Sequence, residues 1–292
     1  MDPRAIRRFK KNRAAIAGAV IVAFLVAFAL LAPLFSQDPL ASDFLHGRMP
    51  EGTPSPPSLT HLLGTDAIYR DVLARLAHGA RFSLEIGVAA SAISLFIGAA
   101  AGIVAGYTEG RGVVLGPLRF GVDGLIMRFV DIGLSFPFLL LVMAIGAALD
   151  RTTEWTILAV LGLTSWLGTA RVVRAKTIQI RELDFVLASR ALGQRTPAIL
   201  VRHILPNVAG ILIVIGTISI AQMILAESVL SYLNLGIEPP TPTWGRMLLE
   251  GQRVYLASPW LLAAPGVCIL LAVLGFNLLG EGLRDALDPK EP

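Results

Sequence analysis

The sequence predicts an all-α, polytopic membrane protein with six transmembrane helices and both termini in the cytoplasm. Of its 292 residues, 54% are hydrophobic and only 16% are charged, whereas soluble domains carry about 45–50% apolar and about 25% charged residues. The apolar residues gather in six runs, each close to the ~20 residues that cross a bilayer. The positive charges are distributed unequally between the loops that join these runs. This composition excludes a soluble enzyme and a disordered chain.

Six apolar runs are the predicted spans. They cover residues 14–35, 86–107, 129–149, 155–170, 208–226 and 257–280. The first run is too long for the ~7–15 apolar residues of a secretory signal, so we expect it to be retained as a span. Pro137 is expected to break the third run after Phe136. The fourth run extends into Arg171 and Arg174, whose long side chains can reach the interface.

The positive charges predict the orientation of these spans. With six spans, both termini lie on one side of the membrane. That side holds 18 of the 25 Lys and Arg residues, seven of them in the segment 171–202. The positive-inside rule therefore places both termini in the cytoplasm. The sequence pI of about 9.6 is explained by this topology. The expected partner of the basic residues is therefore the lipid bilayer, and no nucleic-acid partner is required.

The predicted organisation follows the spans. It comprises a basic cytoplasmic N-terminus (1–13), the first transmembrane helix (14–35), an extracytoplasmic loop with an interfacial helix (36–82), a core of five transmembrane helices (83–282) and a cytoplasmic tail (283–292). In the loop, Thr65 or Asp66 can cap a short amphipathic helix and Gly79 can stop it. In the second span, Gly98, Gly102 and Gly106 share one helix face. They predict close packing against another helix of the bundle in preference to a dimer seam.

Three acidic residues lie within or beside the predicted spans, and such residues are functional candidates by default. Asp131 lies near the cytoplasmic boundary, so we expect it to pair with Arg128 or a neighbouring helix. Glu227 is deeper and precedes a polar run that includes Ser231. Whether Glu227 faces a translocation path or is structural stays open. Glu85 is expected at the outer interface.

The cytoplasmic segment 175–207 predicts a helix–turn–helix. An amphipathic helix over 185–192 should stop at Gly193, and a second should begin with Thr196 as N-cap and Pro197 in its first turn. Pro206 should end the second helix. With apolar and basic residues side by side, the segment is suited to docking into a groove of a partner protein. A peripheral helix lying on anionic lipid is the alternative.

Catalytic and cofactor motifs are absent from the sequence. None of the four lysines follows a glycine, which excludes a Walker A loop for ATP. The four histidines are scattered, and the single Cys268 excludes an intrachain disulfide and a cysteine metal cluster. We therefore expect no enzyme activity and no cofactor in this chain.

The segment Phe185-Val-Leu-Ala-Ser-Arg-Ala-Leu-Gly193, followed by Arg202-His-Ile-Leu-Pro-Asn207, resembles the cytoplasmic EAA motif of ABC-importer permease subunits. The whole chain resembles the second membrane subunit of dipeptide and oligopeptide importers. Further matches in order are Leu63-Gly-Thr-Asp66 with Arg70-Asp71, Met127-Arg-Phe-Val-Asp131, Ser135-Phe-Pro137, Ala226-Glu-Ser-Val-Leu-Ser231, Leu233-Asn-Leu-Gly236, Pro242-Thr-Trp-Gly245 and the tail from Gly280 to Pro289.

This resemblance implies a type I ABC-importer-like bundle in the bacterial inner membrane that imports di- or oligopeptides. It implies a heterodimer with a homologous membrane subunit, two cytoplasmic ATPase subunits that bind ATP and Mg, and an extracytoplasmic substrate-binding protein. The residues expected to couple to the ATPases are Leu187, Ala188, Ser189, Arg190, Gly193 and Pro206. The residues expected along the translocation path are Glu227, Ser231 and Asp131.

The chain departs from the family pattern at four positions. The acidic residue of the motif falls on Leu187, its second alanine on Ser189 and its isoleucine on His203, and the usual small residue before Arg70 is Tyr69. Because Leu187 has no charge, the salt bridge that the motif would form there is not expected. Docking of the helix by shape is still expected.

A self-sufficient channel or proton-coupled carrier is the alternative function, with Glu227 and Asp131 as relays. It predicts transport by this chain alone, without ATP.

Overall fold

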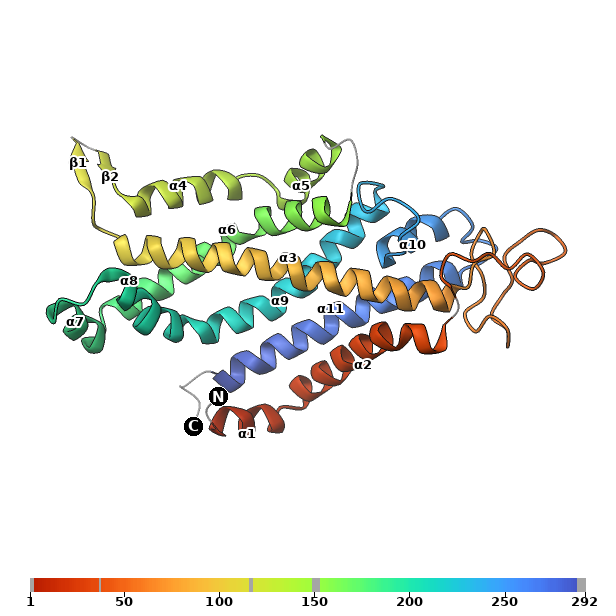
Figure 1. Cartoon of the computed structure of the whole chain (residues 1–292), viewed down its shortest axis with the longest axis horizontal. Helices are drawn as coiled ribbons and strands as arrows, with labels where there is room; N and C mark the ends of the chain where they lie inside the picture. The colour runs from red at the N-terminus through yellow and green to blue at the C-terminus, as the bar shows by residue number, and fades with distance from the viewer. Residues whose placement is uncertain (1–2, 37, 116–117, 149–152, 288–292) are drawn as a thin grey trace.

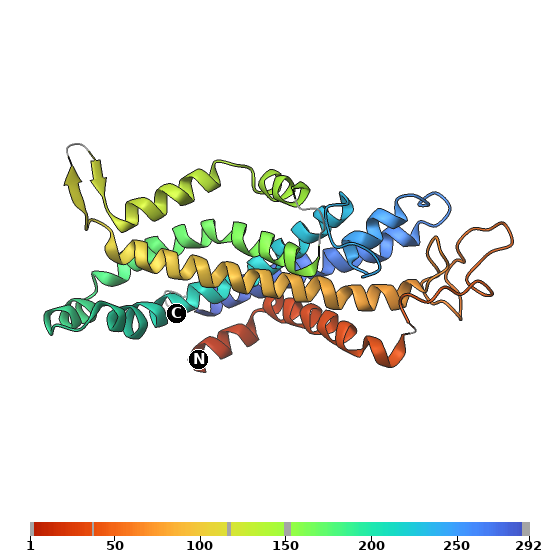
Figure 2. The ribbon, with the colours of Figure 1, turned by 45° about the horizontal axis from the view of Figure 1, so that its top comes forward.

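In the computed structural model, the long apolar runs form long helices that lie side by side (Figures 1 and 2). The structure describes residues 3–36, 38–115, 118–148 and 153–287. The helices are α1 (Pro3–Lys11), α2 (Arg13–Phe35), α3 (Val72–Thr108), α4 (Val122–Leu134), α5 (Phe138–Ala147), α6 (Glu154–Arg181), α7 (Asp184–Ala191), α8 (Thr196–Ile199), the π-helical turn η1 (Leu200–Ile204), α9 (Leu205–Tyr232), α10 (Trp244–Gly251) and α11 (Trp260–Leu287). Two short antiparallel strands, β1 (Val113–Leu115) and β2 (Leu118–Phe120), join α3 to α4. The sequence pattern did not predict this hairpin.

Five helices are long and apolar enough to cross a membrane, and a bent pair supplies a sixth candidate. The five are α2, α3, α6, the continuous helix Thr196–Tyr232 and α11. The pair is α4 and α5, which meet at an angle of 83°. The predicted break at Pro137 is confirmed, because α4 ends at Leu134 and Pro137 is the N-cap of α5. The all-helical, polytopic fold class is thereby confirmed with five or six candidate spans.

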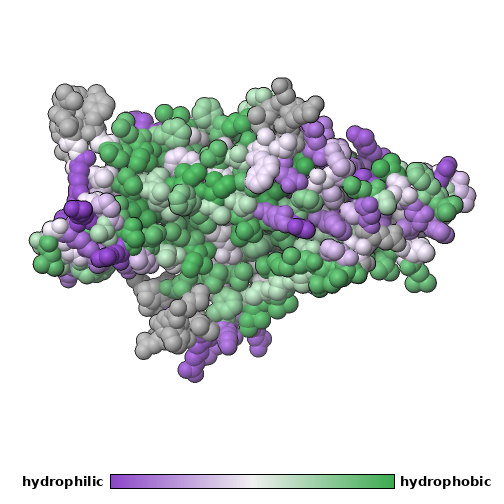
Figure 3. All heavy atoms as spheres, in the orientation of Figure 1, coloured by the Kyte–Doolittle hydropathy of each residue, from purple (hydrophilic) through white to green (hydrophobic). Residues whose placement is uncertain are grey.

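On the face shown in Figure 3, hydrophobic side chains cover most of the middle of the molecule, and hydrophilic ones gather at its two ends and in smaller groups elsewhere. One end, which we call the loop end, carries residues 38–71 and α10 (Figure 1). The other end carries α7, α8 and η1, which we call the knob (184–204). Helix α1 and the end of α11 lie nearer to the knob than to the loop end (Figure 1). A bilayer around the apolar middle would leave both ends in water.

The glycine face of α3 packs directly on α6, which confirms the predicted packing inside the bundle. A Cβ built on Gly98 would lie 2.7 Å from the Cβ of Thr169. Cβ atoms built on Gly102 and Gly106 would each lie 2.6 Å from a backbone carbonyl oxygen of α6. Only glycine allows this approach, so the four-residue spacing sets the separation of α3 and α6.

The other side of the bundle surrounds a core at the loop end. Trp244 of α10 is fully buried among α2, α3, α9 and α11, and its Nε1 donates to the carbonyl of Leu76, 3.2 Å away. Gly79 lies against Thr243 and Trp244, whose nearest atoms are 3.5 Å from a built Cβ. The core therefore fixes α10 against the first turns of α3.

The separate interfacial helix predicted between Thr65 and Gly79 is wrong. Helix α3 begins at Val72, with the side chain of Asp71 accepting from the backbone N–H of Ala74, and it continues through Gly79 because α10 buries this part of the helix. The predicted boundary between residues 82 and 83 therefore lies inside α3. The boundary between 282 and 283 lies inside α11, and residues 288–292 of the predicted tail are outside the described residues.

Candidate functional site

The knob has the predicted helix–turn–helix shape. Helix α7 ends at Ala191, and Gly193 follows with φ +76°, a conformation that other residues adopt only with strain. The N–H of Gly193 donates to the carbonyl of Arg190, and that of Gln194 to Ser189. These bonds satisfy carbonyls left free at the end of α7. The predicted stop at Gly193 is thus confirmed.

The second helix of the knob differs from the prediction at both ends. Its N-cap is Arg195 and not Thr196, which is the first helical residue, and Pro197 lies in the first turn as expected. Pro206 does not end the helix. In the π turn the N–H of Leu205 donates to the carbonyl of Leu200. This wider turn carries the chain past the proline, which has no N–H to donate, and α9 continues.

The four predicted coupling residues in α7 divide into two groups according to the contacts of their side chains. Leu187 is 40% exposed and Ala188 is exposed, so both are available to a partner. Leu192 is 87% exposed and Phe185 43%, and together with Leu187 they form what we call the apolar face of the knob. Leu192 was not among the predicted coupling residues. The leucine directly before the helix-stopping glycine is the sequence signal that could have indicated it.

Ser189 and Arg190 contact their own chain. The Oγ of Ser189 donates to the carbonyl of Phe185 at 2.8 Å and lies 3.2 Å from Nε2 of His203. The guanidinium of Arg190 lies over the ring of Tyr107 at the end of α3, 5.4 Å from its centroid. A cation over an aromatic face is attracted by the ring. Arg190 therefore attaches the knob to the bundle, whereas the contacts of Ser189 lie within the knob, and sequence reasoning did not identify His203 or Tyr107 as their partners.

The ends of α3 and α6 are also tied together beside the knob. Arg181 at the end of α6 donates from Nη1 to the carbonyls of Gly106 and Glu109, at 2.9 and 2.8 Å. Its Nη2 lies 2.6 Å from Oε2 of Glu109. An arginine that binds the last carbonyls of a helix stabilises that end. These contacts hold the end of α3 and the end of α6 together beside the knob.

The acids on the surface of the bundle form ion pairs. Asp131 pairs with Arg171 of α6, which confirms the expected pairing with a neighbouring helix and not with Arg128. Glu85 pairs with Arg81 at 2.8 Å, and both side chains are more than half exposed.

Glu227 is fully buried and serves as a junction between three helices. Its carboxylate accepts from Ser231 Oγ at 2.7 Å and from Ser83 Oγ of α3 at 3.5 Å. Ser83 Oγ in turn accepts from the backbone N–H of Trp244 at 3.3 Å. Ser231 is only 1% exposed. In this structure the contacts of Glu227 and Ser231 are with their own chain.

A cavity of about 500 Å³ lies where α4 and α5 separate, between that break, α6 and α9. Its apolar wall includes Leu134, Phe136, Leu139, Met223 and Val229, and its polar groups are Thr164, Ser165 and Gln222. Helix α5 begins here with Pro137 as N-cap and no side-chain cap for its first N–H groups. Irregular backbone at membrane depth is tolerated only where it is buried in protein or lines a water-filled space. Neither Glu227 nor Ser231 lines this cavity.

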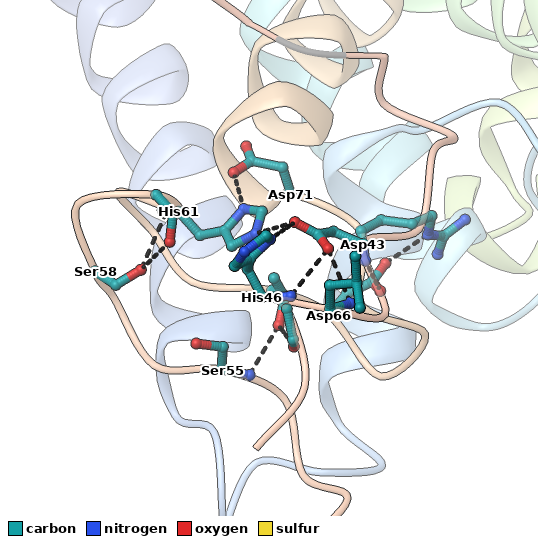
Figure 4. Close-up of polar contacts among 12 residues, drawn as sticks. Asp43, His46, Ser55, Ser58, His61, Asp66 and Asp71 are labelled. Atoms are coloured by element: carbon teal, nitrogen blue, oxygen red, sulfur yellow. Dashed lines mark hydrogen bonds and ion pairs between the residues drawn. The ribbon is translucent and has the colours of Figure 1, made fainter. Parts of the chain in front are cut away.

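A histidine and two aspartates join the segments of the loop end (Figure 4). His61 is 1% exposed, its Nδ1 lies 2.8 Å from Oδ2 of Asp71 and its Nε2 3.4 Å from Oδ2 of Asp43. The backbone N–H of His46, followed by that of Leu45, holds the pKa of Asp43 below its ordinary value of 3.8, against the opposing effect of burial. Among the described residues, no group of His, Cys, Asp and Glu is suited to a metal ion.

A second polar network fastens the loop to α10. Arg75 is 2% exposed, and its Nη1 lies 2.6 Å from both Asp66 Oδ2 and Glu250 Oε2. Arg70 reaches the same two carboxylates, at 2.6 and 3.0 Å. Charges that are buried and paired in this way hold their elements in one arrangement. These ion pairs therefore connect the loop to α3 and α10.

Comparisons with known proteins agree with this architecture. Residues 98–291 match the family model described as binding-protein-dependent transport system inner membrane component. Residues 4–50 match the N-terminal TM domain of oligopeptide transport permease C. Among solved structures, the chain is similar to one described as inward facing conformations of the MetNI methionine ABC transporter, with TM-score 0.56 and 17% identity, covering 73% of this chain and 96% of that one. This likeness shows the fold.

Curated relatives match over nearly the full length. The chain is 37% identical to the oligopeptide transport system permease protein OppC of Bacillus subtilis, over 98% of this chain and 88% of that protein. It is 38% identical to the dipeptide transport system permease protein DppC of Alkalihalophilus pseudofirmus, over 98% and 89%. It is 36% identical to the glutathione transport system permease protein GsiD of Pectobacterium atrosepticum, over 97% and 89%. The chain therefore belongs to the family of binding-protein-dependent transport system inner membrane components, as a multi-pass permease subunit of an ABC transporter complex with ATPases and a binding protein.

Proposed function

We propose that this chain forms half of the translocation path of an ATP-driven importer of short peptides and couples that path to ATPase subunits through its knob. Full-length similarity to OppC, DppC and GsiD supports the substrate class, because those relatives are named for oligopeptides, dipeptides and glutathione. The knob supports the coupling. It is a helical projection with an apolar face, attached to α3 through Arg190 and Tyr107 and exposed at one end of the bundle.

The complex would contain a homologous membrane subunit, two cytoplasmic ATPase subunits and an extracytoplasmic substrate-binding protein. The knob end would lie in the cytoplasm with both termini, where the positive charges of the sequence place it. The loop end would then face the binding protein. ATP binding and hydrolysis would occur in the partners, since this chain has no phosphate-binding loop.

The cavity beside the α4–α5 break is the part of the path that this chain would contribute. Its walls accept apolar peptide side chains, and Thr164, Ser165 and Gln222 offer hydrogen bonds to a passing backbone. The roles of Asp131 and Glu227 in the path remain predictions. In this structure Asp131 pairs with Arg171, and Glu227 accepts hydrogen bonds from Ser83 and Ser231.

Reconstitution of the complete complex in liposomes tests this function. ATP-dependent uptake of labelled di- and tripeptides, requiring the binding protein, is the expected result. Uptake by this chain alone without ATP, abolished by Glu227→Gln, would instead establish the carrier alternative.

Thiol labelling tests the position of the path. Cys268, the single cysteine, is buried and can be replaced by serine. In that background, Gln222→Cys should react with a charged, membrane-impermeant thiol reagent and block uptake. Leu270→Cys is a matched control, because Leu270 of α11 is 62% exposed on the apolar surface and should be shielded by lipid. Equal reactivity at the two positions would place the path elsewhere.

A third experiment tests the knob. Leu192 is 87% exposed, so Leu192→Asp should change stability by less than about 0.5 kcal/mol yet abolish peptide-dependent ATP hydrolysis. Leu192→Met keeps the apolar side chain and should retain it. Full activity of the aspartate variant would contradict docking through this face.

A further inference from the structure

Three polar side chains close the turn of the knob from inside. Nε2 of His203 lies 3.2 Å from Oγ of Ser189 in α7 and 3.1 Å from Oε1 of Gln194 in the turn. We call His203, Ser189 and Gln194 the clasp. Because the Ser189 hydroxyl already donates to the carbonyl of Phe185 at 2.8 Å, Nε2 carries the hydrogen and donates to both oxygens. The clasp thus joins α7, the turn and η1 through one imidazole nitrogen.

The imidazole ring also packs on α7. Its centroid lies 6.0 Å from the ring of Phe185, at an interplanar angle of 49°. Phe185 and Ser189 are one helical turn apart and so occupy the same face of α7. That face borders η1 through His203, while part of the Phe185 side chain stays exposed. His203 therefore contacts α7 through Ser189 and through Phe185, which is itself one of the residues of the apolar face.

Apart from the two backbone hydrogen bonds that close the end of α7, few contacts hold the turn. Helix α7 has only eight residues, and Gly193 in the turn has no atom within 4 Å of a built Cβ. The fully buried Val186 holds α7 to the core but supplies no directional bond. Hydrogen bonds are directional, so the clasp is suited to fix the rotation of α7.

We propose that His203 is a positioning residue, which sets the orientation of α7 through the clasp and thereby couples ATP hydrolysis in the partner to movement of substrate. This inference rests on the proposed function of the knob. The position differs from the family motif, in which the resemblance places an isoleucine, so the clasp would be a feature of this chain and not a property carried over from the motif.

Two variants separate the hydrogen bonds from the packing. His203→Phe keeps an aromatic ring against Phe185 and removes the donor. His203→Gln keeps an N–H at nearly the reach of Nε2 and removes the ring. Val201→Ala, on the exposed surface of the same turn, is the matched control. Each is incorporated into the complete transporter with its binding protein and a labelled dipeptide, and the number of ATP molecules hydrolysed per peptide imported is measured.

The expected result for His203→Phe is an increase of about fivefold in ATP per peptide, corresponding to loss of the net stabilisation of a hydrogen bond. His203→Gln and Val201→Ala should remain near the wild-type ratio. If His203→Phe matches the wild type, or if Phe and Gln raise the ratio equally, the clasp does not position α7.

A distance measurement separates this inference from the proposed function. Spin labels at Asp184 of α7 and Val172 of α6, both exposed, report the orientation of α7 in the full chain in lipid nanodiscs, in a Cys268→Ser background. The distance distribution should broaden in His203→Phe and not in His203→Gln. An unchanged distribution in His203→Phe refutes the clasp whether or not the complex transports peptide. Absence of ATP-dependent uptake by the wild-type complex refutes only the proposed function.

Discussion

Replacing Gly102 by alanine should force α3 and α6 apart. A Cβ at this position would lie 2.6 Å from the carbonyl oxygen of Ala170, 2.7 Å from the Cβ of Val173 and 3.0 Å from the backbone N of Arg174. Ordinary contact begins at 3.4 Å, so the nearest atom must recede by 0.8 Å, the difference between 3.4 and 2.6 Å. That atom belongs to the backbone of α6 and cannot move aside by changing rotamer.

The cost of this separation follows from the packing of the interface. Overpacking a well-packed core costs about 1–3 kcal/mol, while the change from glycine to alanine in a helix stabilises it by up to about 1 kcal/mol. Gly266→Ala in α11 isolates the second effect, because no atom lies within 4 Å of its built Cβ. The difference between Gly102→Ala and Gly266→Ala should therefore be about 1–3 kcal/mol of unfolding free energy.

Reversible unfolding of the purified chain by SDS in mixed micelles, followed by tryptophan fluorescence, measures this difference. Gly266→Ala should unfold at the wild-type concentration or above it, and Gly102→Ala at a lower one. If Gly102→Ala is as stable as Gly266→Ala, the helices can separate at no cost, and the glycine face does not set their distance.

The same unfolding assay should show that Arg75→Met costs about 1.5–3 kcal/mol, because Asp66 and Glu250 lose their buried arginine partner and keep only Arg70; wild-type stability would contradict this. Gly193→Ala should raise the number of ATP molecules hydrolysed per peptide imported, since φ +76° costs alanine about 1–2 kcal/mol. Gly193→Asn should raise this number less. Wild-type numbers for both variants would show that the turn tolerates either residue. Hydrogen exchange of the His46 amide should accelerate in acid, because the lowered pKa of Asp43 gives stability that is present above pH 3.8 and is lost as the pH falls through the lowered pKa. In Asp43→Asn, the exchange rate of the His46 amide should not change over this pH range, once the intrinsic pH dependence of amide exchange is subtracted.

The sequence predicted local features where a short-range pattern is sufficient. Continuous apolar runs yielded five of the spans, because a bilayer demands ~20 apolar residues whatever the packing. Pro137 and Gly193 interrupt helices by their own backbone chemistry, so their effects could be assigned from one residue. The spacing of Gly98 and Gly102 indicated a packing face, although not its partner.

The errors arose at two residues that resemble helix ends but lie inside continuous helices. Gly79 resembles a helix stop, yet α3 passes through it because Trp244, far along the chain, buries that turn. Pro206 resembles a helix end, but a π turn shifts the hydrogen bonds before it. In the first case, burial by another element outweighs the local preference of a single residue. In the second, the shifted backbone hydrogen bonds leave no need for the N–H that proline lacks.

The sequence by itself determined the membrane class, the sidedness of charge and the position of the knob, because hydropathy, net charge and glycine chemistry act within a few residues. Only the tertiary structure decided which side chains of the knob are exposed and which hold it in place. It also decided that Glu227 joins three helices while a cavity opens beside the α4–α5 break. Hydrogen bonds and cavities require atoms from separate helices to meet within a few ångström, and one-dimensional spacing along a chain does not specify that meeting.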